Sequence, residues 1–241
     1  MIESAPRRAL QPGEMAPDFA LPLVGEEGQA SLSRYRGRAP LLLVISRGLW
    51  CSFCRRYLAQ LSGTRDGLQQ LGVDMLAIVA SDLERARLYV RHRPMKMALA
   101  ADPERTTHRA YGLPNPPMTA EIGESLKTKR VDIEKIAVTA DDLAGLRAAA
   151  QTITAAPDNS TGGQQQLQLF GDLVLMQRRL YPYELTEGEQ REKDRHVTLG
   201  TGQFLIDRDG VVRWTNVQAI TGLESVANQA EILAAARTVT G

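Results

Sequence analysis

The chain contains two cysteines, Cys51 and Cys54, with two residues between them. A disulfide between them would close so short a loop that it could add little stability by constraining the unfolded chain. Proteins that use disulfides as a scaffold spread their cysteines along the sequence instead. The spacing therefore points to redox chemistry, in which one thiolate attacks an oxidised substrate and the second thiol closes a disulfide with it.

A cysteine attacks as its thiolate, and because an ordinary thiol titrates at roughly 8.5, a reactive one needs stabilisation of negative charge. The pattern predicts a helix that begins at Cys51, where unpaired backbone N–H groups and the helix dipole favour a thiolate. Cys54, one turn later, is close enough to form the disulfide. Trp50 could shield the pair and shape a docking surface, or could simply fill the loop. Three arginines supply positive charge near the motif: Arg47, Arg55 and Arg56.

Three other interpretations of the cysteine pair stay open. The thiols could be structural, because free cysteine is often buried. The motif is also half of a zinc site, but the chain has no second cysteine pair, and His92, His108 and His196 lack ligand spacing. The chain could instead be a non-catalytic scaffold with vestigial cysteines, in which another segment is a binding or dimerisation module. We expect neither a cofactor nor a metal.

Buried strands alternate with single helices around the motif. A continuous apolar run at residues 41–45 is typical of a strand buried on both faces, and a turn then leads into the helix at Cys51. Further strands are expected at residues 73–80 and 97–100, with a helix at residues 83–91 between them. An Asp-Pro pair after the last of these strands is placed as the N-cap and first residue of another helix. This order predicts right-handed crossovers and a parallel sheet core.

The alternation stops at a Pro-rich stretch. Residues 116–197 are expected to form an insertion, largely helical and partly mobile, with helices near residues 141–151 and 167–180. Order returns in a β-hairpin, where two apolar runs flank an Asp-Gly turn, and an Ala-rich helix then closes the chain. The predicted redox domain therefore comprises residues 1–115 and 198–241.

Composition and charge argue against several classes of function. The formal net charge is +1 and aromatic residues make up 5% of the chain, so neither a basic surface nor stacking platforms for nucleic acid are expected. No apolar run reaches the roughly 18 residues that a spanning helix needs, and no secretory leader is recognisable. We therefore expect no nucleic-acid or membrane partner and a cytoplasmic location.

Several collinear motifs resemble the peroxiredoxin family, also called the alkyl hydroperoxide reductase/thiol-specific antioxidant (AhpC/TSA) family. Residues 13–19 resemble its G-x-x-A-P-D-F opening, and residues 47–55 resemble its R-G-x-W-C-P-x-C site. Residues 101–112 are similar to its D-P … A-Y-G stretch, and residues 204–213 to its late hairpin. The resemblance implies a thioredoxin-like α/β fold, with a central mixed sheet flanked by helices and a largely helical insertion before the last hairpin.

The resemblance also implies an activity and its partners. A peroxiredoxin-like oxidoreductase reduces peroxides with an external thiol donor, such as a thioredoxin-type protein or a small thiol, and could form a homodimer. A thioredoxin-like enzyme would act on disulfides instead, so that alternative stays open. Cys51 is the candidate attacking thiolate and Cys54 the candidate resolving thiol, but for a peroxide substrate the identity of the peroxidatic cysteine stays open.

Four further residues are candidates for contact with substrate. Arg47 could steady a thiolate or a peroxide oxygen, and Trp50 could line the approach to the cysteines. Thr201 and Gly202 are expected to face the pair and to present backbone to a substrate. Typical peroxiredoxins carry Thr or Ser three residues before the attacking cysteine, where this chain has Gly48, and an arginine before the late strand, where this chain has none.

Overall fold

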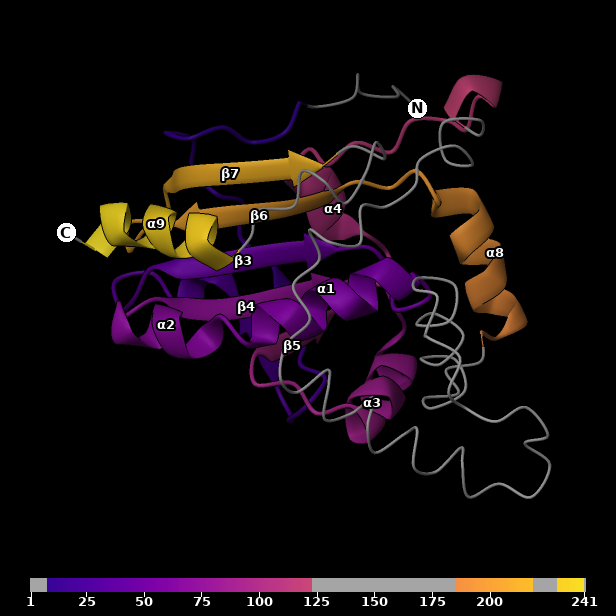
Figure 1. The fold of residues 1–241 in the computed structure, drawn as a ribbon, viewed down its shortest axis with the longest axis horizontal. Coiled ribbons are helices and arrows are strands. Elements are labelled where there is room, and N and C mark those ends of the chain that lie inside the picture. Colours follow the sequence, from indigo (N-terminus) through magenta and orange to yellow (C-terminus); the bar gives the residue numbers. More distant parts are fainter. Residues whose placement is uncertain (1–7, 123–184, 219–228, 241) are drawn as a thin grey trace, which may run out of the picture. The chain divides into compact units, whose positions relative to one another are not determined.

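Five strands form the central sheet of the computed structural model, in the order β5-β4-β3-β6-β7 (Figure 1). The structure describes residues 8–122, 185–218 and 229–240. All of them belong to one compact unit of the chain, which comprises residues 1–129 and 185–241. The sheet, its covering helices and the cysteine motif therefore lie within a single unit.

The central strand, β3 (Leu41–Ser46), has a parallel neighbour on one side and an antiparallel neighbour on the other. These are β4 (Asp74–Val79) and β6 (Thr201–Ile206). β5 (Ala98–Ala101) extends the parallel part, and β7 (Val212–Gln218) pairs antiparallel with β6. All six residues of β3 are buried, as expected for a strand covered on both faces. The structure thus confirms the predicted α/β fold with a mixed sheet.

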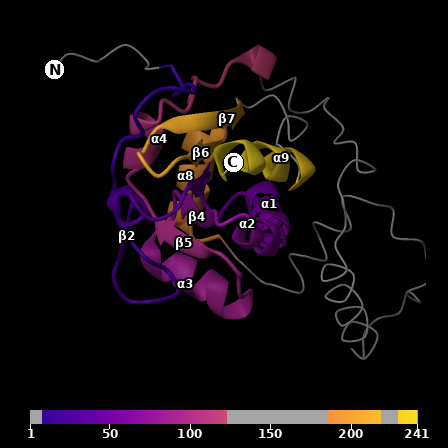
Figure 2. The ribbon, with the colours of Figure 1, turned by 90° about the vertical axis from the view of Figure 1, so that its left-hand side faces the viewer.

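Helices cover one face of this sheet. The helices on this face are α1 (Ser52–Ser62), α2 (Arg65–Gln70) and α9 (Gln229–Thr240). Figure 2 shows them on the side of the sheet opposite α4 and the N-terminal hairpin. α4 is Thr106–Ala110, and α3 (Leu83–His92) connects β4 to β5. Gly63 is the C-cap of α1, and α2 follows almost at once, where the sequence analysis expects no helix.

The chain before β3 folds into a small hairpin, which the sequence analysis does not predict. β1 (Ala20–Pro22) pairs antiparallel with β2 (Gln29–Ser31), and a single 3₁₀ turn, Leu32–Arg34, follows. Strands of three residues carry too little alternation to be recognised in a sequence. Their apolar side chains join the core on the second face of the sheet, with Phe19, Leu21, Leu32, Leu43, Ile45, Ile78 and Phe204 among its members.

Two of the three predicted helix starts are confirmed. Cys51 and Asp82 are the N-caps of α1 and α3. The prediction that Asp102 is an N-cap is wrong, because the Asp-Pro pair enters a turn in which the Arg105 N–H donates to the Asp102 carbonyl at 3.0 Å. α4 begins after Arg105, which is left-handed with a φ of 57°. The Asp102 carboxylate still accepts the backbone N–H of Thr106, the first residue of α4, at 3.0 Å. Asp102 therefore stabilises the N-terminus of α4 although it is not the N-cap residue.

The predicted insertion, residues 116–197, is described only in part. α8 (Glu187–His196) lies near its C-terminal end. The helices expected at residues 141–151 and 167–180 lie outside the described residues, so the domain division stays a prediction. The predicted late hairpin corresponds to β6 and β7, and the predicted closing helix overlaps α9. Within the described ranges, no helix combines the length and apolarity needed to cross a membrane.

Candidate redox site

The two cysteines lie where β3 ends and α1 begins. Cys51 is the N-cap of α1 in an extended conformation, and its Sγ accepts the backbone N–H of Cys54 at 3.3 Å. The Sγ atoms of Cys51 and Cys54 are 2.7 Å apart, within hydrogen-bonding distance, and both cysteines are free thiols. One turn of helix thus brings both sulfur atoms together beside the helix N-terminus, where negative charge is favoured.

The cysteine pair is buried under apolar side chains. The relative exposure is 6% for Cys51, 3% for Cys54 and 6% for Trp50. These three residues form an apolar cluster of their own, and the partly buried side chain of Leu185 packs against it. The Trp50 side chain therefore shields the thiols, and Leu185 joins it from a segment more than 130 residues later in the chain.

The two thiols titrate as one unit because their sulfur atoms are hydrogen-bonded. Burial acts to raise the pKa of Cys54, but the hydrogen bond with Cys51 and the positive charge of Arg47 outweigh it and lower the pKa to about 6. The same hydrogen bond, together with burial, raises the pKa of Cys51 well above its usual range. Near neutral pH the pair therefore carries one negative charge and one remaining proton.

Arg47 supplies the positive charge that stabilises this state. Burial acts to lower the pKa of the Arg47 guanidinium, but the charges of Cys54 and Cys51 outweigh it and raise that pKa. The Arg47 Nη1 also donates to the carbonyl oxygen of Val197 at 3.0 Å. Ser46, fully buried at the end of β3, favours the Cys54 thiolate as well by lowering its pKa. Arg47 thus joins the cysteine pair to the chain that follows α8.

The loop before Cys51 is held by hydrogen bonds to its backbone. The Cys51 N–H donates to the carbonyl of Gly48 at 3.0 Å, and the Leu49 N–H donates to the Ser81 hydroxyl at 2.7 Å. Arg55, which the sequence analysis offers as a charge near the thiols, is buried, and its Nη1 donates to the Leu49 carbonyl. Arg55 therefore helps to fix the loop.

Gly48 stands three residues before Cys51, where typical peroxiredoxins carry a hydroxyl side chain. A Cβ at Gly48 would collide with the Trp50 ring and would lie 2.6 Å from the carbonyl oxygen of Ala80. Distances under 3 Å are essentially never seen for a Cβ, so no side chain fits here without a shift of the loop. The indole of Trp50 occupies the space that a threonine would need.

We predict that Gly48→Ala destabilises the fold by roughly 1–3 kcal/mol, because the added methyl group overpacks a buried loop. Chemical denaturation with urea measures the effect. Gly25→Ala is the matched control, since a Cβ there meets nothing within 4 Å and should change stability by less than about 0.5 kcal/mol. Equal stabilities for the two variants would contradict the close packing of Trp50 over Gly48.

The sequence analysis misses two buried polar residues near the cysteine pair, Tyr57 and Gln203. Tyr57 follows Cys54 by three residues on α1 and is buried, and burial together with the charge of Cys54 raises its pKa well above the usual range. The Gln203 side-chain amide, buried on β6, donates to the Tyr57 hydroxyl. The helical spacing of Tyr57 from Cys54 could have indicated it. Gln203 carries a weaker signal, as a polar residue in an apolar strand.

Thr201 and Gly202 are the first two residues of β6. Because β6 runs antiparallel to β3, they lie beside the C-terminal end of β3, where Gly202 pairs with Ile45. Because side chains alternate along a strand, Thr201 lies on the same face as Gln203, and Gly202 lies on the opposite face. The Thr201 hydroxyl donates to the Gln218 side-chain oxygen at 3.4 Å. A Cβ at Gly202 would lie within 2.7 Å of Phe204 and Leu113 side-chain atoms, so this glycine permits close packing in the core.

Two histidines, His108 and His196, have described side chains. Burial lowers the pKa of His108 to about 4, so this side chain is neutral at pH 7. The His196 ring lies 3.2 Å from the Asn115 amide nitrogen at the end of α8. In the part of the chain that the structure describes, no group of three or more His, Cys, Asp or Glu residues could hold a metal ion.

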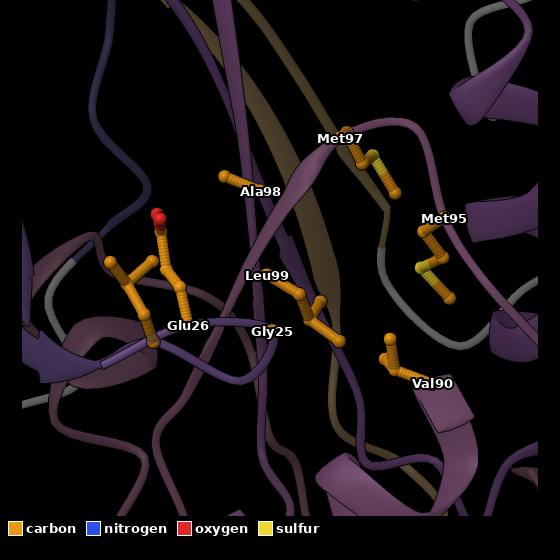
Figure 3. A pocket seen from close by; sticks show the side chains of 8 residues that line it. Gly25, Glu26, Val90, Met95, Met97, Ala98 and Leu99 are labelled. Carbon is orange, nitrogen blue, oxygen red and sulfur yellow. The ribbon is translucent and has the colours of Figure 1, made fainter. Parts of the chain in front are cut away.

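A hollow of about 160 Å³ lies elsewhere, beside the edge strand β5 (Figure 3). Figure 3 shows apolar side chains around it, among them Met95, Met97 and Leu99, together with the carboxylate-bearing side chain of Glu26. The hollow contains no thiol, so it is separate from the redox site. Its lining residues are Leu23, Gly25, Glu26, Val90, Met95, Met97, Ala98 and Leu99.

Comparison with solved structures shows which known folds the chain resembles. No curated protein matches the sequence. Among solved structures, the chain resembles peroxidoxin BcpB from Mycobacterium tuberculosis, with 12% identity, 97% of this chain and 99% of that chain covered and a TM-score of 0.52. It also resembles the mitochondrial 2-Cys peroxiredoxin from Plasmodium falciparum, with 12% identity, 95% and 94% covered and a TM-score of 0.51. These likenesses confirm the fold.

The family itself is shown by the sequence. The profile of the AhpC/TSA family matches residues 12–215, more than half of the chain. This range includes the cysteine pair, Arg47 and the start of the late hairpin. The chain therefore belongs to the AhpC/TSA family and carries out thiol redox chemistry.

Proposed function

We propose that the chain is a thiol-dependent peroxidase in which Cys51 attacks the peroxide and Cys54 resolves the product. The observation that carries the proposal is the pair of free thiols with sulfur atoms 2.7 Å apart beside the partly buried Arg47. Such a pair holds a single negative charge at neutral pH and is already positioned to close a disulfide. The family match supports this reaction class.

The attack begins with a proton shift within the pair. Cys54 holds the charge first, because its pKa is the lower one, and it takes the proton of Cys51 across the short contact. The Cys51 thiolate is then stabilised by the Cys54 backbone N–H and by the start of α1. Its sulfur attacks one peroxide oxygen, the O–O bond breaks, and the leaving oxygen departs as hydroxide, which is protonated to water. Cys51 is left as a sulfenic acid.

Resolution uses the second thiol. The Cys54 sulfur attacks the Cys51 sulfur, the S–OH bond breaks, and the hydroxide leaves with the proton of Cys54 as a second water. The two electrons that reduce the peroxide thus come from the two thiols, which become one disulfide. An external thiol donor, a thioredoxin-type protein or a small thiol, then returns the pair to the dithiol. The donor and a homodimeric state are predictions that the family resemblance supports.

A second candidate function is the reduction of disulfides. It is favoured by the C-x-x-C spacing and by the absence of a hydroxyl side chain at Gly48, where typical peroxiredoxins hold the peroxide. The chain also resembles a candidate protein disulfide isomerase from Bacteroides thetaiotaomicron, with 14% identity, 97% and 94% covered and a TM-score of 0.50. In this reaction Cys51 would attack a substrate sulfur, and Cys54 would release the reduced substrate.

Steady-state kinetics with dithiothreitol as donor separates these functions. We expect hydrogen peroxide to be consumed in proportion to donor oxidised, with a higher kcat/KM than for the disulfides of insulin. Reduction of insulin without consumption of peroxide would contradict the peroxidase and favour the second candidate. If neither substrate is turned over faster than by the donor alone, both redox functions fail and the non-catalytic scaffold is the better account.

A further inference from the structure

The segment at residues 185–197, here called the cover, lies over the cysteine pair. It consists of Leu185, Thr186, α8 and Val197. At its start, Leu185 packs against the cluster of Trp50 and the two cysteines. At its end, the Val197 carbonyl accepts the hydrogen bond from Arg47. In Figure 1 α8 stands at the end of the sheet where β3 ends and α1 begins.

Charged contacts hold the cover to the body of the protein. α8 contains no buried residue, so it has no apolar face with which to pack. Instead Glu189 forms an ion pair with Arg85 of α3 at 2.8 Å, and Glu192 forms one with Arg105 directly before α4. Exposure is 12% for the Glu189 side chain and 37% for that of Glu192. Among the residues that the structure describes, the attachment therefore consists of ion pairs and hydrogen bonds, with Leu185 as its apolar contact.

An attachment of this kind is easily broken. Ion pairs that remain partly exposed contribute little to stability and are screened by salt. Segments held by few apolar contacts open at a much lower free energy than the core. The cover should therefore detach while the sheet, α1 and the cysteine pair stay folded.

We infer that the cover sets the size of substrate that reaches the cysteine pair, an inference that rests on the proposed thiol redox function. With the cover in place, 6% of Cys51 and 3% of Cys54 are exposed, so we expect only an oxidant as small as a peroxide to reach the thiols. A disulfide must bring both of its sulfur atoms, with their substituents, in line with the attacking thiolate. Disulfides therefore react only after the cover detaches, and Glu189 and Glu192 are specificity-determining residues.

The inference also gives a role to the end of the predicted insertion. Arg47 binds the Val197 carbonyl and stabilises the thiolate of the pair, so the cover and the thiols share one side chain. The helix of the cover, α8, is capped at its N-terminus by a capping box, in which the side chains of Thr186 and Glu189 each accept the backbone N–H of the other. The cover can thus move as an intact helix.

The test compares two oxidants of different size on the full chain. The rates of reaction of the reduced protein with hydrogen peroxide and with dithiodipyridine, a neutral aromatic disulfide, are measured for wild type and for Glu189→Gln/Glu192→Gln. Glutamine keeps the capping box but removes the charge. The matched control is Glu187→Gln/Asp194→Asn, which removes two charges from α8 whose partners lie within α8 itself.

Loss of both ion pairs should raise the detached population, and with it the dithiodipyridine rate, roughly tenfold. The peroxide rate should change less than twofold, and the control variant should match wild type for both oxidants. Equal dithiodipyridine rates in wild type and the Glu189/Glu192 variant would overturn the inference, as would a common rise with both oxidants. A protein inert to peroxide that still shows the selective rise would contradict the peroxidase but support the cover.

Discussion

Cys51→Ser is expected to reduce peroxide consumption to the level of the uncatalysed reaction. A serine hydroxyl in this position cannot ionise near neutral pH and cannot form a sulfenic acid, so the attack that we assign to Cys51 is lost. The backbone contacts at the start of α1 persist, because the serine oxygen can also cap the helix. The measurement is peroxide consumption in the presence of dithiothreitol, with urea denaturation to show that the variant is folded.

Cys54→Ser is the informative partner of this variant. The attack by Cys51 remains, but no second thiol is available to close the disulfide within the chain. The reduced protein should consume about one equivalent of peroxide in the absence of donor, and Cys51 should carry a sulfenic acid that adds about 16 Da. If Cys54→Ser loses the first reaction with peroxide while Cys51→Ser retains it, the assignment of the two roles is reversed.

Removal of the Arg47 charge is expected to shift the pH dependence of thiol reactivity. Without this charge the pKa of Cys54 rises from about 6, although the hydrogen bond with Cys51 still lowers it, so the reactivity curve moves to higher pH. At pH 7 the thiolate fraction would fall from about 90% to about 3% if the full shift were lost, a decrease of up to roughly thirtyfold. The rate of alkylation by iodoacetamide, measured from pH 5 to 10, gives the curve for Arg47→Met.

The sign of this effect separates it from damage to the fold. A thiolate is populated above its pKa, so the wild type and Arg47→Met should differ most near pH 7 and converge at alkaline pH. Arg47→Lys keeps a positive charge and should retain most of the low-pH reactivity. A uniform loss of rate at every pH in Arg47→Met, with an unchanged midpoint, would contradict the electrostatic role of this arginine.

The sheet and its helices could be predicted because local sequence carries their signals. The continuous apolar run of β3, the Asp82 cap and the Asp-Gly hairpin each depend on residues that lie close together in the chain. The short hairpin of β1 and β2 could not be recognised, because strands of three residues are stabilised by packing on the core. The prediction that Asp102 caps a helix was wrong because a turn that ends at Arg105 comes first, so α4 begins three residues later than expected.

The cysteine pair and its position at a helix start were predictable from spacing. The rest of the site depends on contacts between distant segments. Gln203 is brought to Tyr57 by the pairing of β6 with β3, and Leu185 is brought to Trp50 by the placement of the cover. Local sequence marks such residues only weakly, as with one polar residue in an apolar strand, because their role depends on neighbours that are distant in the chain.

The most direct test of the account is the intact mass and thiol content of the reduced wild-type protein after one equivalent of hydrogen peroxide. Because the chain has two cysteines, any change in thiols must occur at this site. We expect the mass to fall by about 2 Da, both thiols to disappear together and dithiothreitol to restore them. Two unchanged thiols, or a stable oxygen adduct without a disulfide in the wild type, would contradict the central claim that Cys51 and Cys54 act as a redox pair.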